Sequence, residues 1–291
     1  FGDGTVTPPP ATQARPGQNI RPAGQDARQG DTVLAAGTRV SARAIGLAAS
    51  VGVSELAVRR PRVVVLSSGD ELLPPGAPPA PGKIYNSNGP LMESLLADSG
   101  FPDVTALWLP DDRARTREAL DQLLADPPDL VMASGGVSVG EEDHLRAVLE
   151  ERGELDFWRL AIKPGKPFTF GRLGDAGVPF FGLPGNPSAV LVCYLMLVLP
   201  YLRRCLGVEP VLPAPQRLPA EFAVKPGPRQ EYLRVRRVSR DGAVVLEKHP
   251  NQSSGMLSSA VWADGLAVAP VDHGQAAGEP LDYYSFADLL A

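Results

Sequence analysis

The stretch RVVVLSSGDEL, from Arg62 to Leu72, decides the fold, because an unbroken aliphatic run is followed at once by a polar turn with two carboxylates. A strand that is apolar on both faces is typical of a parallel sheet whose two sides are covered by helices. Parallel strands are joined by crossover connections, which are usually helices, so strands and helices should alternate along the chain. The run therefore predicts an α/β domain that begins near Pro61.

The residues on the C-terminal side of this run continue the alternation. The expected helices cover residues 88–99, with Asn88 as the cap, 112–125 and 144–152. The expected strands cover residues 104–109, 129–134, 156–162, 168–172 and 178–181, and an apolar helix begins at Pro187. This order is typical of an α/β fold with a doubly wound, mostly parallel sheet, which we place at residues 61–207.

Two further regions flank this domain. Residues 1–60 are polar and rich in Pro and Gly, with one helical patch at 38–52, and we expect a remnant of N-terminal or connector domains there. Beyond Gly207 the helical periodicity ends, and short strands follow that are joined by an Asp241-Gly242 turn. Residues 208–291 are therefore predicted to form a small C-terminal β domain.

Composition excludes several classes of protein. The chain has 28 Lys and Arg against 33 Asp and Glu, and 6% of its residues are aromatic. Both values argue against nucleic acid as a partner, since nucleic-acid binders carry basic stripes interleaved with stacking rings. The three histidines have no metal-ligand spacing, so no zinc or haem site is expected. An anionic ligand must be held by local features of the chain.

The apolar segment Ser188–Leu202 bears on location and redox state. It is shorter than the ~18 residues of a membrane span and contains Pro200, so we expect a buried helix and no membrane as a partner. Cys193 and Cys205 would lie ~18 Å apart on one continuous helix, which is too far for a disulfide. We therefore expect a cytoplasmic protein.

Four polar segments follow strands of the predicted sheet, where the ligands of open α/β proteins bind. The first, SSGDEL, presents Asp70 and Glu71. The second, SGGVSVGEED from Ser134 to Asp143, lines up backbone donors before a helix, which suits phosphate although it is neither a Walker loop nor a dinucleotide fingerprint. The plainer alternative is that these carboxylates only cap turns and helices.

The other two segments add positive charge and a helix start. IKPGKP places Lys163 and Lys166 on either side of a Pro-Gly turn, and GLPGNPS begins the apolar helix with Asn186 able to cap it and Ser188 in its first turn. Solvated lysines and an ordinary capped helix are the plainer alternatives. Because all four segments should open on one edge of one sheet, together they predict a site for a polyanion with Mg²⁺.

These four motifs, together with KIYNSN from Lys83 to Asn88 and a small β domain after them, resemble the molybdopterin molybdenumtransferases, the MoeA and gephyrin E-domain family. The resemblance implies a MogA-like α/β domain that binds the pterin phosphate. It implies an enzyme that inserts molybdate into adenylylated molybdopterin with release of AMP, uses Mg²⁺, and works as an elongated homodimer. Molybdopterin adenylyltransferase is a further partner suggested by the same resemblance.

The resemblance assigns roles residue by residue. The matched functional carboxylates are Glu71, Asp143, Asp111, Asp112 and Asp26, of which Glu71 and Asp143 would bind the metal. The residues matched to substrate binding are Ser134, Gly135, Gly136, Ser138, Arg159, Lys163, Lys166, Asn186 and Ser188. The residues matched to molybdate are Lys163, Ser188, Arg234, Ser253 and Ser254. Arg159 stands where relatives often have lysine.

One further departure from the family pattern and two alternative functions remain open. The FDNSAMDGYA-like segment of the family's N-terminal region is not found in these 291 residues. The α/β fold would also suit a molybdopterin adenylyltransferase, although IKPGKP and the β domain argue against it. A scaffold that binds molybdopterin without turnover is the non-enzymatic alternative.

Overall fold

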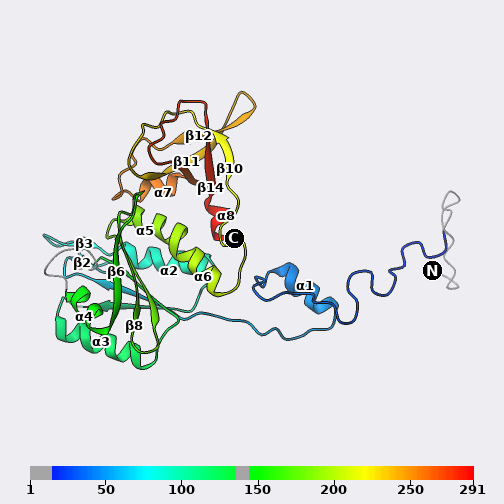
Figure 1. Cartoon of the computed structure of the whole chain (residues 1–291), viewed down its shortest axis with the longest axis horizontal. Coiled ribbons are helices and arrows are strands. Elements are labelled where there is room, and N and C mark those ends of the chain that lie inside the picture. The colour runs from blue at the N-terminus through cyan, green and yellow to red at the C-terminus, as the bar shows by residue number, and fades with distance from the viewer. Residues whose placement is uncertain (1–14, 110, 136–143) are drawn as a thin grey trace. The chain divides into compact units, whose positions relative to one another are not determined.

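The structure, a computed structural model, describes residues 15–109, 111–135 and 144–291, and the chain divides into two compact units, residues 1–57 and 58–291 (Figure 1). The first unit contains the helix α1 (Ala42–Ser50), whose N-cap Ser41 accepts a hydrogen bond from the Ala44 backbone at 3.3 Å. Among the described residues of this unit, only Ala44 and Ala48 have buried side chains. This unit therefore has almost no core of its own.

The second unit is built on a six-stranded sheet. Its strands, in spatial order, are β4 (Val104–Leu109), β1 (Val63–Ser68), β5 (Leu130–Ser134), β9 (Val178–Leu183), β8 (Pro167–Leu173) and β6 (Gly153–Arg159). The first four are parallel, and β8 is antiparallel to both of its neighbours. The sheet is therefore mostly parallel, as the aliphatic run of β1 predicts.

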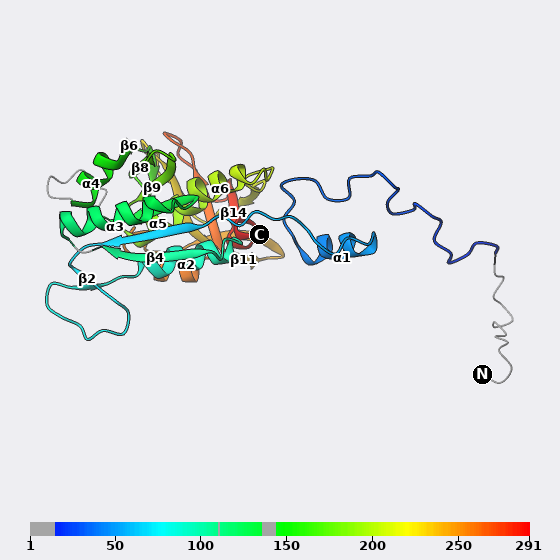
Figure 2. The same cartoon turned by 90° about the horizontal axis from the view of Figure 1, so that it is seen from below.

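Alternate residues of β1 belong to two hydrophobic clusters, one on each side of the sheet. Val63 and Val65 pack with α2 (Asn88–Asp98) and the helix that starts at Pro187, whereas Val64 and Leu66 pack with α3 (Arg113–Ala125) and α4 (His144–Arg152). Figure 2 shows these helices on both faces of the sheet. The doubly wound α/β fold is confirmed.

The apolar helix is longer than the sequence suggested. It runs through α5 (Pro187–Cys193), a π-helical turn η1 (Tyr194–Val198) and α6 (Leu199–Cys205). Pro200 does not end it, because the π turn locally frees the backbone and places the proline in the first turn of α6. The helix has 19 residues, more than the segment Ser188–Leu202 that the sequence suggested. Among the described residues it is the one helix that is long and apolar enough to cross a membrane, with a mean hydropathy of 1.5. However, 67% of its apolar segment is buried inside the protein.

The C-terminal part forms a second sheet. Its strands, in spatial order, are β10 (Gln216–Pro219), β14 (Pro280–Ser285), β13 (Gly265–Ala269), β11 (Gln230–Arg240) and β12 (Ala243–Lys248). A bridge between Ala220 and Leu246 brings the two edges of the sheet together. Asp241 and Gly242 both have positive φ, 49° and 81°, as a two-residue type I′ hairpin turn requires. The predicted β domain and its turn are confirmed.

The α/β part and the β part are joined by a strand pairing and by a common hydrophobic cluster. The short strand β7 (Ile162–Lys163), which follows β6, pairs in parallel with the start of β11. The hydrophobic cluster between sheet and α5 also contains Tyr232, Leu266 and Leu289 from the C-terminal part. Two short helices, α7 (Ser258–Trp262) and α8 (Phe286–Leu290), and the strand pair β2 (Leu72–Leu73) and β3 (Ile84–Tyr85) complete the unit. The ends of the central strands therefore lie close to the β domain.

Candidate oxyanion site

Three of the four polar segments start at one edge of the sheet. Ser67 near the end of β1 is paired with Ser134 at the end of β5, and Ser134 is paired with Leu183 at the end of β9. The two serines are buried, with 6% and 5% of their surface exposed. Since the three strands are parallel, the loops that follow them leave the sheet at the same edge.

The loop after β1 holds its carboxylates close to the backbone. Gly69 has a φ of +136°, and a Cβ atom on it would lie only 2.3 Å from the Glu71 Oε2 atom. The Glu71 carboxylate therefore folds back over Gly69. Asp70 accepts a hydrogen bond from the Asp111 backbone at 3.4 Å, which brings Asp111 to the same loop. Asp112 caps α3 by accepting from the Arg115 backbone at 2.8 Å.

Two asparagines of the KIYNSN motif join the loops to each other. Asn86 Nδ2 donates to Ser67 Oγ at 3.0 Å. Asn88 Nδ2 donates both to Ser134 Oγ at 2.6 Å and to the Gly185 carbonyl at 2.7 Å. Asn88 is not the helix cap that the sequence suggested, because it is the first residue of α2 and its side chain is hydrogen-bonded to these two loops. Ser87 occupies the cap position and makes no side-chain capping bond.

The start of α5 is held by the β domain. Ser188 is fully buried, its backbone N–H donates to the Ser254 carbonyl at 2.9 Å, and its hydroxyl donates to the Met256 carbonyl at 2.8 Å. Both donors of Ser188 are thus occupied by the protein. Asn186 is at the cap position, as expected, but makes no side-chain capping bond, because the first-turn amide of Ser188 already has the Ser254 carbonyl as its acceptor.

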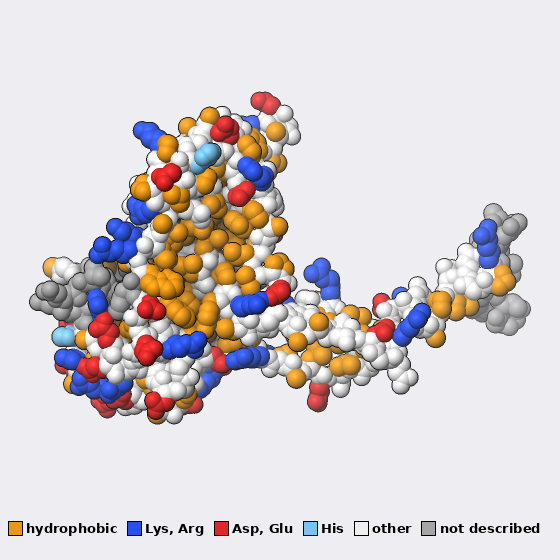
Figure 3. All heavy atoms as spheres, in the orientation of Figure 1, with side chains coloured by type: hydrophobic (Ala, Val, Ile, Leu, Met, Phe, Trp, Pro, Cys, Tyr) orange, Lys and Arg blue, Asp and Glu red, His pale blue; other side chains and the backbone are white. Residues whose placement is uncertain are grey.

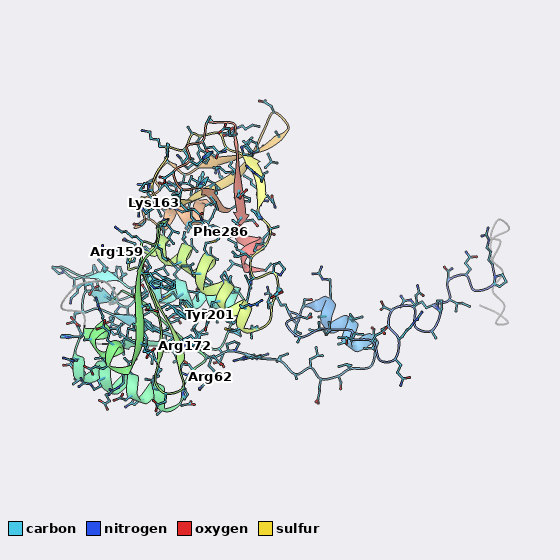
Figure 4. The ribbon with its side chains drawn as sticks, in the orientation of Figure 1. Arg62, Arg159, Lys163, Arg172, Tyr201 and Phe286 are labelled. Atoms are coloured by element: carbon cyan, nitrogen blue, oxygen red, sulfur yellow. The ribbon has the colours of Figure 1, made fainter. Side chains whose placement is uncertain are left out.

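The lysine turn lies at the same junction. Lys163 Nζ forms an ion pair with Glu231 Oε1 at 2.8 Å, and these two residues are also register partners in the β7–β11 pairing. Figure 4 shows Arg159 and Lys163 near each other on the side of the sheet next to the β domain, whereas Arg62 and Arg172 lie toward its far end. Arg159 and Lys166 are exposed, so two further cations are accessible beside Lys163.

Arg234 of β11 is a buried cation. It is 1% exposed, its Nε donates to Ser259 Oγ at 3.2 Å, and its Nη2 donates to the Ser253 carbonyl at 3.1 Å. Burial lowers the pKa of Arg234, and the nearby charge of Glu231 opposes that shift. In the described ranges no carboxylate is recorded in an ion pair with Arg234. A buried guanidinium without an anionic partner is costly, so the site favours an added anion.

The structure brings part of the predicted site together. Arg234 contacts Ser253, and Ser188 contacts Ser254. Lys163 pairs with Glu231, three residues before Arg234 on β11. Asn186 lies two residues before Ser188, and Asn88 joins Ser134 to Gly185 of the same loop. Gly135 follows Ser134, and its backbone N–H donates to the Leu183 carbonyl at 3.4 Å. Gly136, Ser138 and Asp143 lie outside the described residues, and Asp26 is exposed in the N-terminal unit. Within the described part of the chain, no three carboxylate, histidine or cysteine side chains form a metal-binding group.

Sequence reasoning missed several members of this network. Four residues pair with or contact predicted site residues but were not assigned to the site: Ser67, Asn88, Glu231 and Ser259. Asn86 joins the network through Ser67. The asparagines carried a signal, because they belong to KIYNSN, but their amides reach residues 19 and 46 positions away. Contacts over such separations cannot be deduced from local spacing.

An α/β protein whose sheet edge and adjoining β domain present hydroxyls, lysines and a buried arginine has the features expected of the class that binds small oxyanions. Three family models match the chain in order: "MoeA N-terminal region (domain I and II)" at residues 3–52, "Probable molybdopterin binding domain" at 64–204 and "MoeA C-terminal region (domain IV)" at 217–286. The molybdopterin molybdenumtransferase of Haemophilus influenzae is 36% identical over 99% of this chain and 71% of its own length. The chain belongs to the MoeA family, which confirms the resemblance drawn from the motifs.

Other relatives agree. Molybdopterin molybdenumtransferase 2 of Mycobacterium tuberculosis is 35% identical over 89% of this chain and 65% of its own length. The molybdenum cofactor synthesis protein cinnamon of Drosophila melanogaster is 35% identical over 87% of this chain and 42% of its own length. A crystal structure of the MoeA protein of Pyrococcus horikoshii has a TM-score of 0.73 at 28% identity, covering 90% of this chain and 64% of that one. The chain thus spans about two thirds of the length of the Haemophilus, Mycobacterium and Pyrococcus proteins.

Proposed function

We propose that the protein takes part in molybdenum cofactor synthesis as a transferase that inserts molybdate into adenylylated molybdopterin and releases AMP. The observation that carries the proposal is Arg234, a fully buried cation whose recorded hydrogen bonds, among the described residues, go to neutral oxygens. Molybdate is a compact dianion that would supply the missing negative charge and accept N–H and O–H donors. The names of the relatives, molybdopterin molybdenumtransferase, support this choice of oxyanion.

The proposed site has one group of residues for molybdate and another for the pterin phosphate. Lys163 and Arg234 would neutralise molybdate, with hydroxyl donors from Ser253 and Ser254. Ser188 would act by holding the segment 253–256 against α5, because both of its donors are already used there. The buried hydroxyl of Ser134, at the carboxyl edge of the sheet, would bind the pterin phosphate, and Gly135, with a φ of +77°, would let the ligand approach the backbone closely.

The described residues offer Mg²⁺ the exposed carboxylate of Glu71 at this edge of the sheet. Mg²⁺ in phosphate-transfer sites is commonly held by one or two carboxylates together with phosphate oxygens and water. The exposed Glu71 carboxylate at the end of β1 suits this role, and we propose Asp143 as its partner. When bound, Mg²⁺ would neutralise charge on the phosphates that join AMP to the pterin. Glu71 would orient the ion, and Asp111 beside Asp70 would keep this loop in place.

The decisive experiment measures AMP release from adenylylated molybdopterin by the full-length protein, with and without molybdate and Mg²⁺. We expect release that requires both ions. Folded protein that binds adenylylated molybdopterin but releases no AMP would support the scaffold instead. Consumption of ATP with formation of adenylylated molybdopterin would identify an adenylyltransferase.

We further propose that two copies of the chain form a homodimer, as the family resemblance implies. Figure 3 shows a broad apolar area on the second unit, in the region where Figure 4 places Tyr201 and Phe286. Both side chains are only half-buried, and Trp158 is 50% exposed. Exposed apolar surface of this kind is typical of protein interfaces. Sedimentation should give the mass of a dimer, and a monomer at all concentrations would contradict the proposal.

The setting that we propose is the cytoplasm. Cys193 and Cys205 are both free, and they lie on one helix as the sequence suggested. Burial raises the pKa of the Cys193 thiol to about 12, so this thiol stays protonated and unreactive. Free thiols are typical of a reducing compartment.

A further inference from the structure

Two serines at the edge of the sheet share an unusual arrangement with two asparagines. Ser67 and Ser134 are direct register partners on adjacent strands, and each hydroxyl accepts one hydrogen bond from an asparagine amide, from Asn86 at 3.0 Å and from Asn88 at 2.6 Å. The two asparagines are separated by a single residue at the start of α2. A short stretch of chain therefore controls two hydroxyls that are adjacent in space.

The direction of these hydrogen bonds is fixed by chemistry. The Gly185 carbonyl can only accept, so the Asn88 amide must turn its NH₂ group toward it and toward Ser134. Asn86 is fixed in the same way, because its Oδ1 accepts from the Gly89 backbone at 3.0 Å and its NH₂ must then face Ser67. Each serine oxygen is thus an acceptor in this contact, and its own O–H proton is left to donate elsewhere.

Neither proton has a recorded protein acceptor among the described residues, although both serines are buried. The side chain of Asn88 bears a further cost, since its Oδ1 is buried without a hydrogen-bond partner in the same part of the chain. Buried polar groups normally pair, so two buried hydroxyl protons without a protein acceptor among the described residues suggest that the arrangement is kept for a ligand that accepts hydrogen bonds. Two neighbouring O–H donors at the carboxyl edge of a sheet suit the oxygens of a phosphate.

We infer that Asn86 and Asn88 are positioning residues that commit the Ser67 and Ser134 hydroxyls to donate hydrogen bonds to one phosphate group. This inference rests on the proposed function for the identity of that group, the phosphate of molybdopterin. Asn88 has a second effect, because its bond to Gly185 holds the loop before α5 beside Ser134. The asparagines do not touch the phosphate; they set the polarity of the groups that do.

The test is a double-mutant cycle read out as affinity for molybdopterin released from a purified molybdenum enzyme. Asn88→Asp has the same shape but offers Ser134 a carboxylate, toward which the hydroxyl would turn its proton; it also removes the donor to the Gly185 carbonyl. We expect N88D and S134A each to weaken binding about ten-fold, the loss of one charge-assisted hydrogen bond. The double variant should be no weaker than N88D alone, since both changes remove the same donor. Asn86→Asp and Ser67→Ala should behave as a second such pair.

Matched controls separate this role from others. Ser99→Ala removes a buried hydroxyl at the other end of α2, which donates to the Leu95 carbonyl at 2.6 Å, and should lower stability without changing affinity. Additive losses in the N88D/S134A variant would show that N88D acts through its charge or through the lost bond to Gly185 rather than through Ser134, and would overturn the inference. Wild-type affinity in N88D would also overturn it. Failure of the wild-type protein to bind molybdopterin would instead refute the proposed function, and the inference with it.

Discussion

Arg234 shows at the scale of one residue how a binding site is prepared at the expense of stability. A buried charge without a partner loses hydration that two neutral hydrogen bonds restore only in part. Replacing it with an apolar side chain of similar length should therefore change the free energy of unfolding of the ligand-free protein little. We expect Arg234→Met to shift it by less than about 2 kcal/mol in either direction, because lost hydrogen bonds and relieved desolvation oppose each other.

The same variant should lose its response to molybdate. A ligand that binds only the folded state raises the unfolding temperature, and we expect that rise in the wild type but not in R234M. Arg236→Met is the matched control, since Arg236 lies two residues away on β11 and pairs with Glu247 at 2.7 Å outside the site. Thermal unfolding with and without molybdate makes the comparison. An undiminished molybdate shift in R234M would refute the assignment of Arg234.

Gly69 limits the position of the Glu71 carboxylate. Its φ of +136° is unfavourable for any other residue, and an added Cβ would overlap Glu71 Oε2. We expect Gly69→Ala to cost about 1–3 kcal/mol of stability through backbone strain, and to raise the Mg²⁺ concentration needed for AMP release by moving the carboxylate. Gly76→Ala is the control, because Gly76 also has a positive φ, +90°, but no atom lies within 4 Å of its added Cβ. Metal titrations of both variants that coincide would contradict the prediction.

At the scale of elements, one hydroxyl joins the π-helical turn to α2. Tyr194 is fully buried, and its OH lies 3.1 Å from the Leu95 carbonyl oxygen and 2.9 Å from Ser99 Oγ, which share its single proton. Burial raises the pKa of Tyr194, so the hydroxyl stays protonated. Tyr194→Phe should lower the free energy of unfolding by about 1–2 kcal/mol. Tyr85→Phe, which removes an exposed hydroxyl bonded to the Ala77 carbonyl, should have a much smaller effect in the same urea titration.

The pairing of α3 with α4 should depend on pH. Hydrogen bonds from Arg113 and Arg117 hold the pKa of Glu151 below its usual value. A lowered folded-state pKa stabilises the protein above the unfolded-state pKa of ~4.3, and this stabilisation is lost as the pH falls through the folded-state value. Glu151→Gln should therefore be less stable than the wild type at neutral pH, and the difference should shrink on acidification. A difference independent of pH in urea titrations would contradict this assignment.

The elements also show what sequence reasoning could reach. The strands of the parallel sheet follow from aliphatic runs such as Val63–Leu66, and the hairpin at Asp241 follows from its turn residues, because both signals are local. The antiparallel placement of β8 and the pairing of β7 with β11 depend on partners up to 68 residues away, as in the pair Lys163 and Glu231. Likewise, the positions of the site motifs were readable, but the fact that Ser188 is fully occupied by the β domain was not.

At the scale of the whole molecule, the two parts of residues 58–291 should unfold together. Tyr232, Leu266 and Leu289 of the C-terminal part lie in the same hydrophobic cluster as Val190 and Leu195 of the apolar helix. Removing either part would expose the apolar surface of the other, at roughly 25 cal/mol for each Å² uncovered. The boundary near residue 208 therefore separates two architectures that share one hydrophobic cluster, although each also has a cluster of its own.

A protein reduced to residues 58–291 tests this directly. All three hydrophobic clusters of the described chain lie within this range, so we expect the shortened protein to keep the cooperative unfolding transition of the full chain. Far-ultraviolet circular dichroism reports both parts, and the fluorescence of Trp262, in a variant without the other two tryptophans, reports the β part alone. Coincident urea midpoints by the two probes would support one cooperative unit. Separate midpoints would show that the shared cluster contributes too little to couple the two parts.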